Sequence, residues 1–504
     1  MAFTSWTFVL FVAGTAVLYY LLPKGARWVA LLAASYGFYL WGGWRTVGYL
    51  LLTTLTTYAA GLLLGRLNAA QGEKKRIRRR KKGVVWCVLL VNFGMLFALK
   101  YWDFAAGALG LPGLGLVLPL GVSFYIFQSV GYVIDCYRGK YPPQRNPFKF
   151  ALFTSFFPQM VQGPISRYDQ LGPQLLEGHA LDARNLKYGL QLALWGYLKK
   201  LVIADRAAVV VNAIFGSYRQ QGGAVLAAGV LFYCIQLYCD FSGGIDITRG
   251  VAKLFGIELI ENFKRPIFAV SLADYWRRWH ISLGQWLRDY LFYPMALSKP
   301  LGRLGKWSRR AVGGKLGKIL PTSVATFTIY FVIGIWHGAN FRYIAYGFWN
   351  GAIITASLLM EGRFQAARER LGIRPESGRW RAFQMVRTAA LVFIGRYITR
   401  APRLTAAGWM LLQLFRSPRF SQLWDGTLLT FGLGGGDMLV IFLGVAVLLA
   451  AEGYQERGGH IRAALEKKTW FVQWAAILAP LAILLFLGIL RGSYIPAGFI
   501  YQQY

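Results

Sequence analysis

Two short strings carry the residue types best suited to chemistry. They are YWRRWHISLGQWLRDYLFYP at 275–294 and GIWHGANFRYIAYGFWNG at 334–351, and each holds one of the chain's four histidines. His280 and His337 both follow a tryptophan, within or beside a strongly apolar stretch. Neutral histidine suits general-base work, because its unperturbed pKa of roughly 6.5 lies close to neutral pH. These two histidines are the first candidates for catalysis.

The surroundings of His337 favour a reacting imidazole. It follows the apolar run Ile329–Trp336 and precedes Gly338, Ala339 and Asn340. Glycine and alanine leave room beside the ring for a substrate. The alternative is a histidine that only packs one helix against another, and composition alone weighs the two equally.

The segment 271–290 is predicted to be one helix. Ser271 and Asp274 fit a capping box ahead of an apolar run. Aromatic and apolar residues then recur at three- and four-residue spacing, which is typical of one helix face. That face comprises Trp276, Trp279, His280, Leu283, Trp286, Leu287 and Tyr290, whereas Arg277, Arg278, Arg288 and Asp289 occupy other faces. The helix is too polar to span, so we expect it at the membrane interface or in a membrane cavity, with His280 either reactive or a buried core histidine.

Weaker candidates for a pocket lie in other apolar stretches. Asp240 and Ser242 belong to QLYCDFSGG, and a carboxylate in such a stretch is a functional candidate by default. For Asp240 we favour the alternative of an ion pair with an arginine of the 275–288 segment. Gln159 lies in 150–165, which prolines interrupt and which is predicted to be a re-entrant or broken helix.

Other catalytic motifs are absent from the sequence. It contains no G-x-S-x-G nucleophile elbow and no H-E-x-x-H. It has four cysteines but no C-x-x-C pair, so neither a zinc site nor a disulfide framework is indicated. We therefore expect no catalytic metal.

The chain around these motifs reads as an all-α polytopic membrane protein. It is 56% hydrophobic and 16% aromatic, with a mean hydropathy of +0.41. A spanning helix needs roughly 20 apolar residues. Twelve segments approach that length: 3–22, 27–43, 46–66, 84–102, 117–135, 188–215, 224–249, 320–339, 343–360, 380–398, 437–451 and 471–490. Three arginines interrupt 380–398, which makes it the weakest of them.

The charge pattern predicts orientation rather than nucleic-acid binding. Lys and Arg number 56 against 21 Asp and Glu, a net charge of +35. These basic residues gather in loops between apolar segments, as the positive-inside rule requires. The run EKKRIRRRKK at 73–82 fixes one loop as cytoplasmic. Counting the predicted spans in both directions from this loop places both termini outside. The basic stretch 400–419 is an exception to the positive-inside rule, because the same count places it outside; within it, 406–415 is predicted to be an interfacial helix.

The organisation is that of a single membrane domain, 1–504. Within it, 1–116 holds the N-terminal helices, 117–360 the catalytic core with both histidine motifs, and 361–504 the C-terminal helices. The first helix lacks a basic leader and an evident cleavage site, so we expect it to be retained. With neither a covalent nucleophile motif nor a metal site, the chain suits direct attack of a hydroxyl on an activated acyl group.

At these residues the chain resembles the membrane-bound O-acyltransferases (MBOAT), and within them the bacterial branch of alginate O-acetylase-type proteins. The likeness runs nearly the full length. It is carried by 119–139, 156–175, GYLKKLVIADRAA at 196–208, 233–267, the two histidine strings and the ending FIYQQY at 499–504.

The resemblance implies a ring of tilted helices, roughly 11–12 spans plus re-entrant and interfacial helices, around a central tunnel. It implies that His337 is catalytic and that His280 is the second functional position. Donor and acceptor would meet in a pocket formed by Trp276, Arg277, Arg278, Trp279, Trp336, Asn340, Asp240, Ser242 and Gln159.

The implied activity is O-acetylation of an exported or cell-surface polysaccharide from the bacterial cytoplasmic membrane. Acetyl-CoA, or an acyl-carrier thioester, would be a cytoplasmic donor rather than a resident cofactor. A separate extracytoplasmic SGNH-type acetyltransferase would finish the transfer, with membrane lipids as the other partner. Two alternatives are D-alanyl transfer to teichoic acids and a non-enzymatic transporter or flippase.

Overall fold

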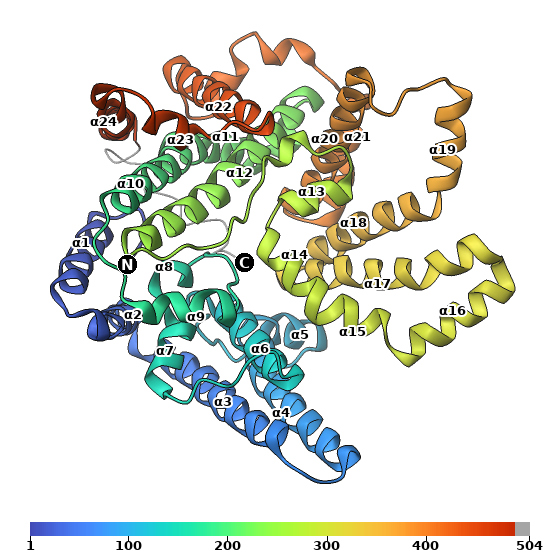
Figure 1. Cartoon of the computed structure of the whole chain (residues 1–504). Coiled ribbons are helices and arrows are strands. Elements are labelled where there is room, and N and C mark those ends of the chain that lie inside the picture. Colours follow the sequence, from blue (N-terminus) through green and yellow to red (C-terminus); the bar gives the residue numbers. More distant parts are fainter. Residues whose placement is uncertain (489–504) are drawn as a thin grey trace. The chain divides into compact units, whose positions relative to one another are not determined.

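The computed structural model describes residues 1–488, so the ending FIYQQY lies outside the described residues. Every regular element in that range is helical, apart from one isolated antiparallel bridge between Phe263 and Trp279. This confirms the all-α prediction. Helices coloured along the sequence are shown in Figure 1.

Two compact units divide the chain. The first comprises Met1–Leu201, Phe241–Glu261 and the stretch from Leu465, and the second comprises Val202–Asp240 and Asn262–Ala464. These boundaries do not coincide with the three segments expected from the sequence, and the prediction of a single domain stays a prediction.

The first unit is built around the N-terminal helices. They are α1 (Trp6–Leu21), α2 (Arg27–Trp41), α3 (Trp44–Ala69), α4 (Lys74–Lys100), α5 (Trp102–Leu109), α6 (Val122–Arg138), α7 (Pro147–Ser155), α8 (Phe157–Met160), α9 (Tyr168–Glu177), α10 (Ala183–Tyr197) and α24 (Trp470–Leu487). The predicted break in 150–165 is confirmed, because α7 ends and α8 begins around Phe156.

The second unit holds both histidine motifs. Its helices are α11 (Asp205–Gly216), α13 (Leu272–Arg278), α14 (Ile281–Leu287), α15 (Tyr293–Ala296), α16 (Lys299–Val312), α17 (Gly314–His337), α18 (Phe341–Leu359), α19 (Glu361–Arg370), α20 (Gly378–Arg400), α21 (Leu404–Arg416) and α22 (Gly435–Glu456). Two helices, α12 (Gly223–Leu254) and α23 (Ile461–Glu466), run across a boundary between the units.

Fewer helices meet the requirements for spanning than the twelve segments predicted. Within residues 1–488, six are long and apolar enough, or seven if the bent pair α18 and α19 counts as one span: α3, α4, α12, α17 from Gly317, α22 and α24. The predicted segment 188–215 is broken, because α10 passes into a π-helical turn, Leu198–Ala204, before α11. Helix α20 forms, but its arginines keep it out of this group.

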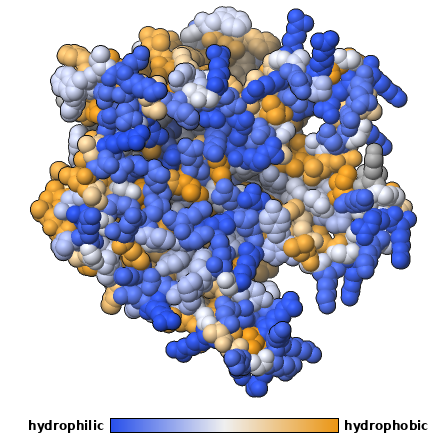
Figure 2. Space-filling model, in the orientation of Figure 1, coloured by the Kyte–Doolittle hydropathy of each residue, from blue (hydrophilic) through white to orange (hydrophobic). Residues whose placement is uncertain are grey.

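Exposed apolar side chains agree with a lipid surround. Large hydrophobic residues are more than half exposed on α1, α4, α22 and α24, for example Trp6, Leu90, Leu443 and Phe486. In water such surfaces would be costly. Hydrophobic residues lie between hydrophilic ones on the face shown in Figure 2.

The pair α17 and α18 positions His337. The two helices lie side by side (Figure 1), and a Cβ on Gly347 would come within 2.6 Å of the Tyr330 carbonyl and 3.0 Å of Gly334 Cα. Only glycine permits so close an approach of two backbones. Helix α17 ends at His337, and the Asn340 side chain caps α18 by accepting from the Arg342 N–H at 3.1 Å.

Candidate functional site

His280 lies at a break in the predicted 271–290 helix. Helix α13 ends at Arg278, Trp279 is extended, and His280 has φ +50° and ψ 53° before α14 begins. The prediction of one continuous helix is wrong because this stretch pairs with 262–264 instead. Lys264 N–H donates to the Arg278 carbonyl at 2.9 Å, and Ile281 N–H donates to the Asn262 carbonyl at 3.0 Å.

The environment of His280 fixes its charge and favours one tautomer. The side chain is 2% exposed, and burial lowers the pKa of the imidazole from 6.5 to about 3. Asn262 Oδ1 accepts from the Ser282 N–H at 2.8 Å and lies 3.5 Å from His280 Nδ1. Because an amide oxygen only accepts, this contact favours the tautomer that carries the proton on Nδ1. His280 is therefore a neutral hydrogen-bonding group at physiological pH.

A single tryptophan joins the two histidines. The ring of Trp336 lies 5.7 Å from that of His280 and 5.1 Å from that of His337, measured between centroids. His337 is half-buried and also lies 6.2 Å from Tyr343 and 6.4 Å from Tyr346. The two histidines, which are 57 positions apart in sequence, thus belong to one aromatic cluster in which both imidazoles neighbour Trp336.

The other tryptophans of the motif support this cluster. Trp276 Nε1 donates to Asn350 Oδ1 at 3.0 Å, and Asn350 in turn donates to the Tyr346 carbonyl at 2.7 Å. Trp279 is buried against Phe263 and Tyr275 at 4.9 and 5.5 Å. The structure therefore brings Trp276, Trp279 and Trp336 together with both histidines, as the sequence predicts.

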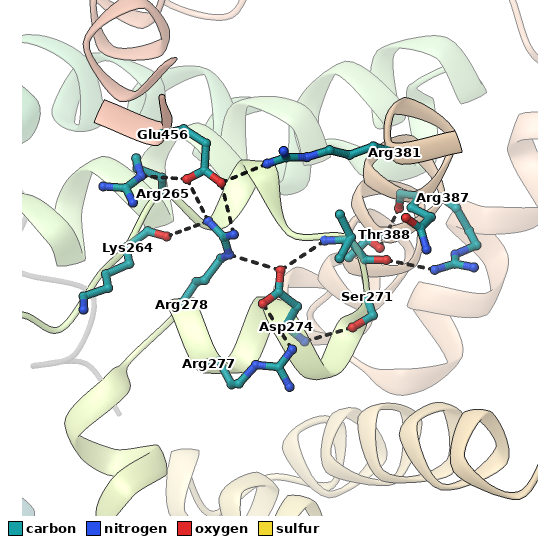
Figure 3. A network of polar contacts seen from close by, with 12 residues as sticks. Lys264, Arg265, Ser271, Asp274, Arg277, Arg278, Arg381, Arg387, Thr388 and Glu456 are labelled. Atoms are coloured by element: carbon teal, nitrogen blue, oxygen red, sulfur yellow. Dashed lines mark hydrogen bonds and ion pairs between the residues drawn. The ribbon is translucent and has the colours of Figure 1, made fainter. Parts of the chain in front are cut away.

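The arginines beside these tryptophans point elsewhere. Arg277 is 69% exposed and pairs with Asp274 at 3.2 Å. Arg278 pairs with Asp274 at 3.1 Å and with Glu456 at 3.0 Å. Figure 3 shows the resulting network, in which Glu456 also binds Arg265 and Arg381 at 2.8 and 3.1 Å. This network links α13 to the start of α20 and the end of α22. It therefore holds in place the helix that carries Trp276.

The cap predicted for this helix is confirmed, and the pairing expected of Asp240 is wrong. Ser271 Oγ accepts from the Asp274 N–H at 3.0 Å. The ion pairs of Arg277, Arg278 and Arg288 go to Asp274, Glu456 and Asp289. Periodicity could not find Glu456, because it lies at the end of a helix more than 170 residues later.

Three predicted pocket residues lie on other elements. Asp240, on α12, is 2% exposed. Ser242 and Gln159 belong to the first unit. There, Lys199 Nζ donates to Ser242 Oγ at 3.0 Å and pairs with Asp246 at 2.7 Å. Gln159 donates to Gln128 at 2.8 Å and accepts from Ser166 at 3.1 Å.

Sequence reasoning missed two side chains of the histidine cluster, Asn262 and Arg396. Asn262, whose side chain contacts His280, follows α12 within the stretch 233–267, but nothing in that stretch marks it as the partner of a histidine. Arg396 could have been noticed in the sequence, because a charged residue that interrupts an apolar segment, here 380–398, is a functional candidate. Among residues 1–488, no group of three or more His, Cys, Asp or Glu side chains could hold a metal ion.

Comparison with known proteins gives this site a context. The family model described as "MBOAT, membrane-bound O-acyltransferase family" matches residues 142–380, which include both histidine strings. A Pseudomonas putida protein named "Probable alginate O-acetylase AlgI" is 35% identical over 432 residues, covering 82% of this chain and 80% of that protein.

More distant relatives carry other acyl-transfer names. The peptidoglycan O-acetyltransferase of Helicobacter pylori is 31% identical over 54% of this chain and 55% of its own length. The teichoic acid D-alanyltransferase of Bacillus subtilis is 26% identical over 61% of this chain and 75% of its own length.

Proposed function

This chain belongs to the membrane-bound O-acyltransferase family and is a multi-pass membrane acyltransferase; from that premise we propose that it acetylates an exported or cell-surface polysaccharide. Acetyl-CoA on the cytoplasmic side supplies the acetyl group. The identity of 35% over most of both chains to an alginate O-acetylase-type protein supports a polysaccharide acceptor.

The observation that carries the proposal is the pair of imidazoles that both neighbour the Trp336 ring. His337 is the general base. Its nitrogen takes the proton of the attacking hydroxyl as the oxygen forms a bond to the carbonyl carbon. The tetrahedral intermediate collapses by breaking the C–S bond, and the departing thiolate takes the proton back from His337. A positioned base of this kind contributes on the order of 10²–10⁴-fold in rate.

His280 helps to bind the acyl donor and takes no part in the proton transfer. Its neutral ring, protonated on Nδ1, presents an acceptor nitrogen from a buried position. With Trp276 and Trp279 it lines the region where the acyl group binds. Its left-handed backbone is a conformation that non-glycine residues adopt mainly where the surroundings enforce it.

The protein acts in the bacterial cytoplasmic membrane, with both termini outside. The donor enters from the basic cytoplasmic side and the acceptor meets it from outside, through a tunnel within the ring of helices. The final acceptor is reached through a separate extracytoplasmic SGNH-type protein.

The second candidate is D-alanyl transfer, which the 26% identity to teichoic acid D-alanyltransferases favours. Mass spectrometry of the surface polymers from a deletion strain separates the two. Loss of acetyl ester supports the proposal, and loss of D-alanyl ester supports the alternative. If neither ester changes while export of an intact molecule fails, the protein is a transporter.

A further inference from the structure

A buried arginine contacts aromatic residues that neighbour the two histidines. Arg396, on α20, is only 6% exposed. Its Cζ lies 5.4 Å from the ring centroids of both Trp279 and Tyr346, so its guanidinium contacts two aromatic rings. One of its nitrogens, Nη2, donates to the Tyr275 hydroxyl at 2.8 Å.

Among the described residues, Arg396 differs from the other fully buried arginine, Arg206, in having no carboxylate partner. Arg206 pairs with Asp437 at 2.9 Å, and Arg278 pairs with Asp274 and Glu456. Within the part of the chain that the structure describes, no acidic side chain comes within ion-pair distance of Arg396. A buried charge is expensive unless it is compensated. Two aromatic faces and one phenol compensate it only in part.

The aromatic partners of Arg396 tie it to the catalytic cluster. Trp279 directly precedes His280, and Tyr346 lies 6.4 Å from the His337 ring. Tyr275 packs on both Trp276 and Trp279. Arg396 is therefore held among residues that also position the two imidazoles. A second cation, Arg342, lies over the Tyr343 ring at 4.9 Å, but it is only half-buried and one of its nitrogens donates to the Ala401 carbonyl at 3.0 Å.

A cation at this position would favour the chemistry proposed for the site. When the hydroxyl oxygen bonds to the acyl carbon, the C=O electron pair moves onto the carbonyl oxygen and creates a negative charge. His280 cannot supply a positive charge, because it is neutral, and its contact with Asn262 favours a proton on Nδ1. A planar guanidinium can give two donors to one oxyanion and stays protonated throughout.

We propose that Arg396, fixed by Tyr275, binds the carbonyl oxygen of the acyl donor and stabilises the oxyanion. This role rests on the proposed function and deepens it. As the intermediate collapses, the C=O bond reforms, the C–S bond breaks, and Arg396 returns to its resting contacts with no net proton change. Removing one oxyanion donor typically lowers kcat by about 10²–10³-fold.

The test compares Arg396→Gln and Arg396→Lys in purified protein in lipid vesicles. Thiol release from acetyl-CoA gives kcat and KM, and the melting temperature reports folding. We expect Arg396→Gln to lower kcat about 100-fold with little change in KM for acetyl-CoA. Arg396→Lys keeps the charge and should recover at least part of kcat.

The matched control is Arg400→Gln, one turn along the same helix. Arg400 also lies over an aromatic ring, Phe215, at 4.8 Å and bonds to Asn212, yet it is not part of the cluster. This variant should keep the wild-type kcat. If Arg396→Gln keeps kcat within threefold, or if its kcat falls only as far as that of Arg400→Gln, the role is overturned.

A second variant covers the case in which Arg396→Gln does not fold. Tyr275→Phe keeps the ring packing and removes the hydroxyl that fixes the guanidinium. A normal melting temperature with a kcat reduced about tenfold supports the role, and an unchanged kcat contradicts it. If wild type and His337→Gln release thiol at the same rate, the proposed function itself fails, independently of Arg396.

Discussion

Acidification should weaken the fold specifically through His280. Because burial lowers its pKa from 6.5 to about 3, the native state binds fewer protons at this residue than the unfolded state between those two values. Stability from this residue is therefore fully present above pH 6.5 and is lost as pH falls towards 3. At pH 5 the loss amounts to about 2 kcal/mol for this one group.

The variant that isolates this effect is His280→Asn. Asparagine adopts the left-handed backbone of position 280 more readily than most residues, and it cannot titrate. Melting temperatures of the solubilised protein are measured at pH 7.5 and pH 5. Wild type should lose more stability between the two than His280→Asn does.

The control for this comparison is His460→Asn, which removes an exposed histidine. It should show the same pH dependence as wild type. If His280→Asn also loses as much stability on acidification as wild type, His280 is not buried as a neutral ring and the account of its environment is refuted.

Two further substitutions test the supports of the cluster. Glu456→Gln removes the carboxylate that joins Arg265, Arg278 and Arg381, and it should lower the free energy of unfolding by about 1–3 kcal/mol. The control is Arg277→Gln, because the side chain of Arg277 is exposed. A melting temperature of Glu456→Gln no lower than that of Arg277→Gln would show that the network is dispensable. Gly347→Ala should separate α18 from α17 and lower the rate of acyl transfer on the order of 100-fold, measured at equal amounts of each variant in the membrane. Gly362→Ala should keep the wild-type rate, because a Cβ there meets no neighbouring atom. Equal activity of the two variants would refute the close crossing of α17 and α18.

The sequence predicted the chemistry of the site better than its geometry. Both histidine strings were identified from residue types alone, and their tryptophans lie together as the motifs suggested. The broken helix at 150–165 followed from its prolines. Such features are local, since residue type and spacing express them directly.

The geometry that was missed depends on contacts between distant segments. Periodicity predicted a continuous helix through His280, but the pairing of Phe263 with Trp279 overrides it. The ion pairs of Arg278 run to Glu456 rather than Asp240, because α22 brings a carboxylate to α13. Arg396 was visible only as an interruption of an apolar segment, and nothing in the sequence placed it beside Trp279.

The most direct test of the central claim is the ester content of surface polysaccharide made by a deletion strain that carries wild type or His337→Gln at equal membrane levels. We predict that polymer export continues and that the ester falls by at least 100-fold with the variant, as expected for loss of a general base. Ester at the wild-type level would contradict the account and leave His337 as a residue that packs α17 against α18.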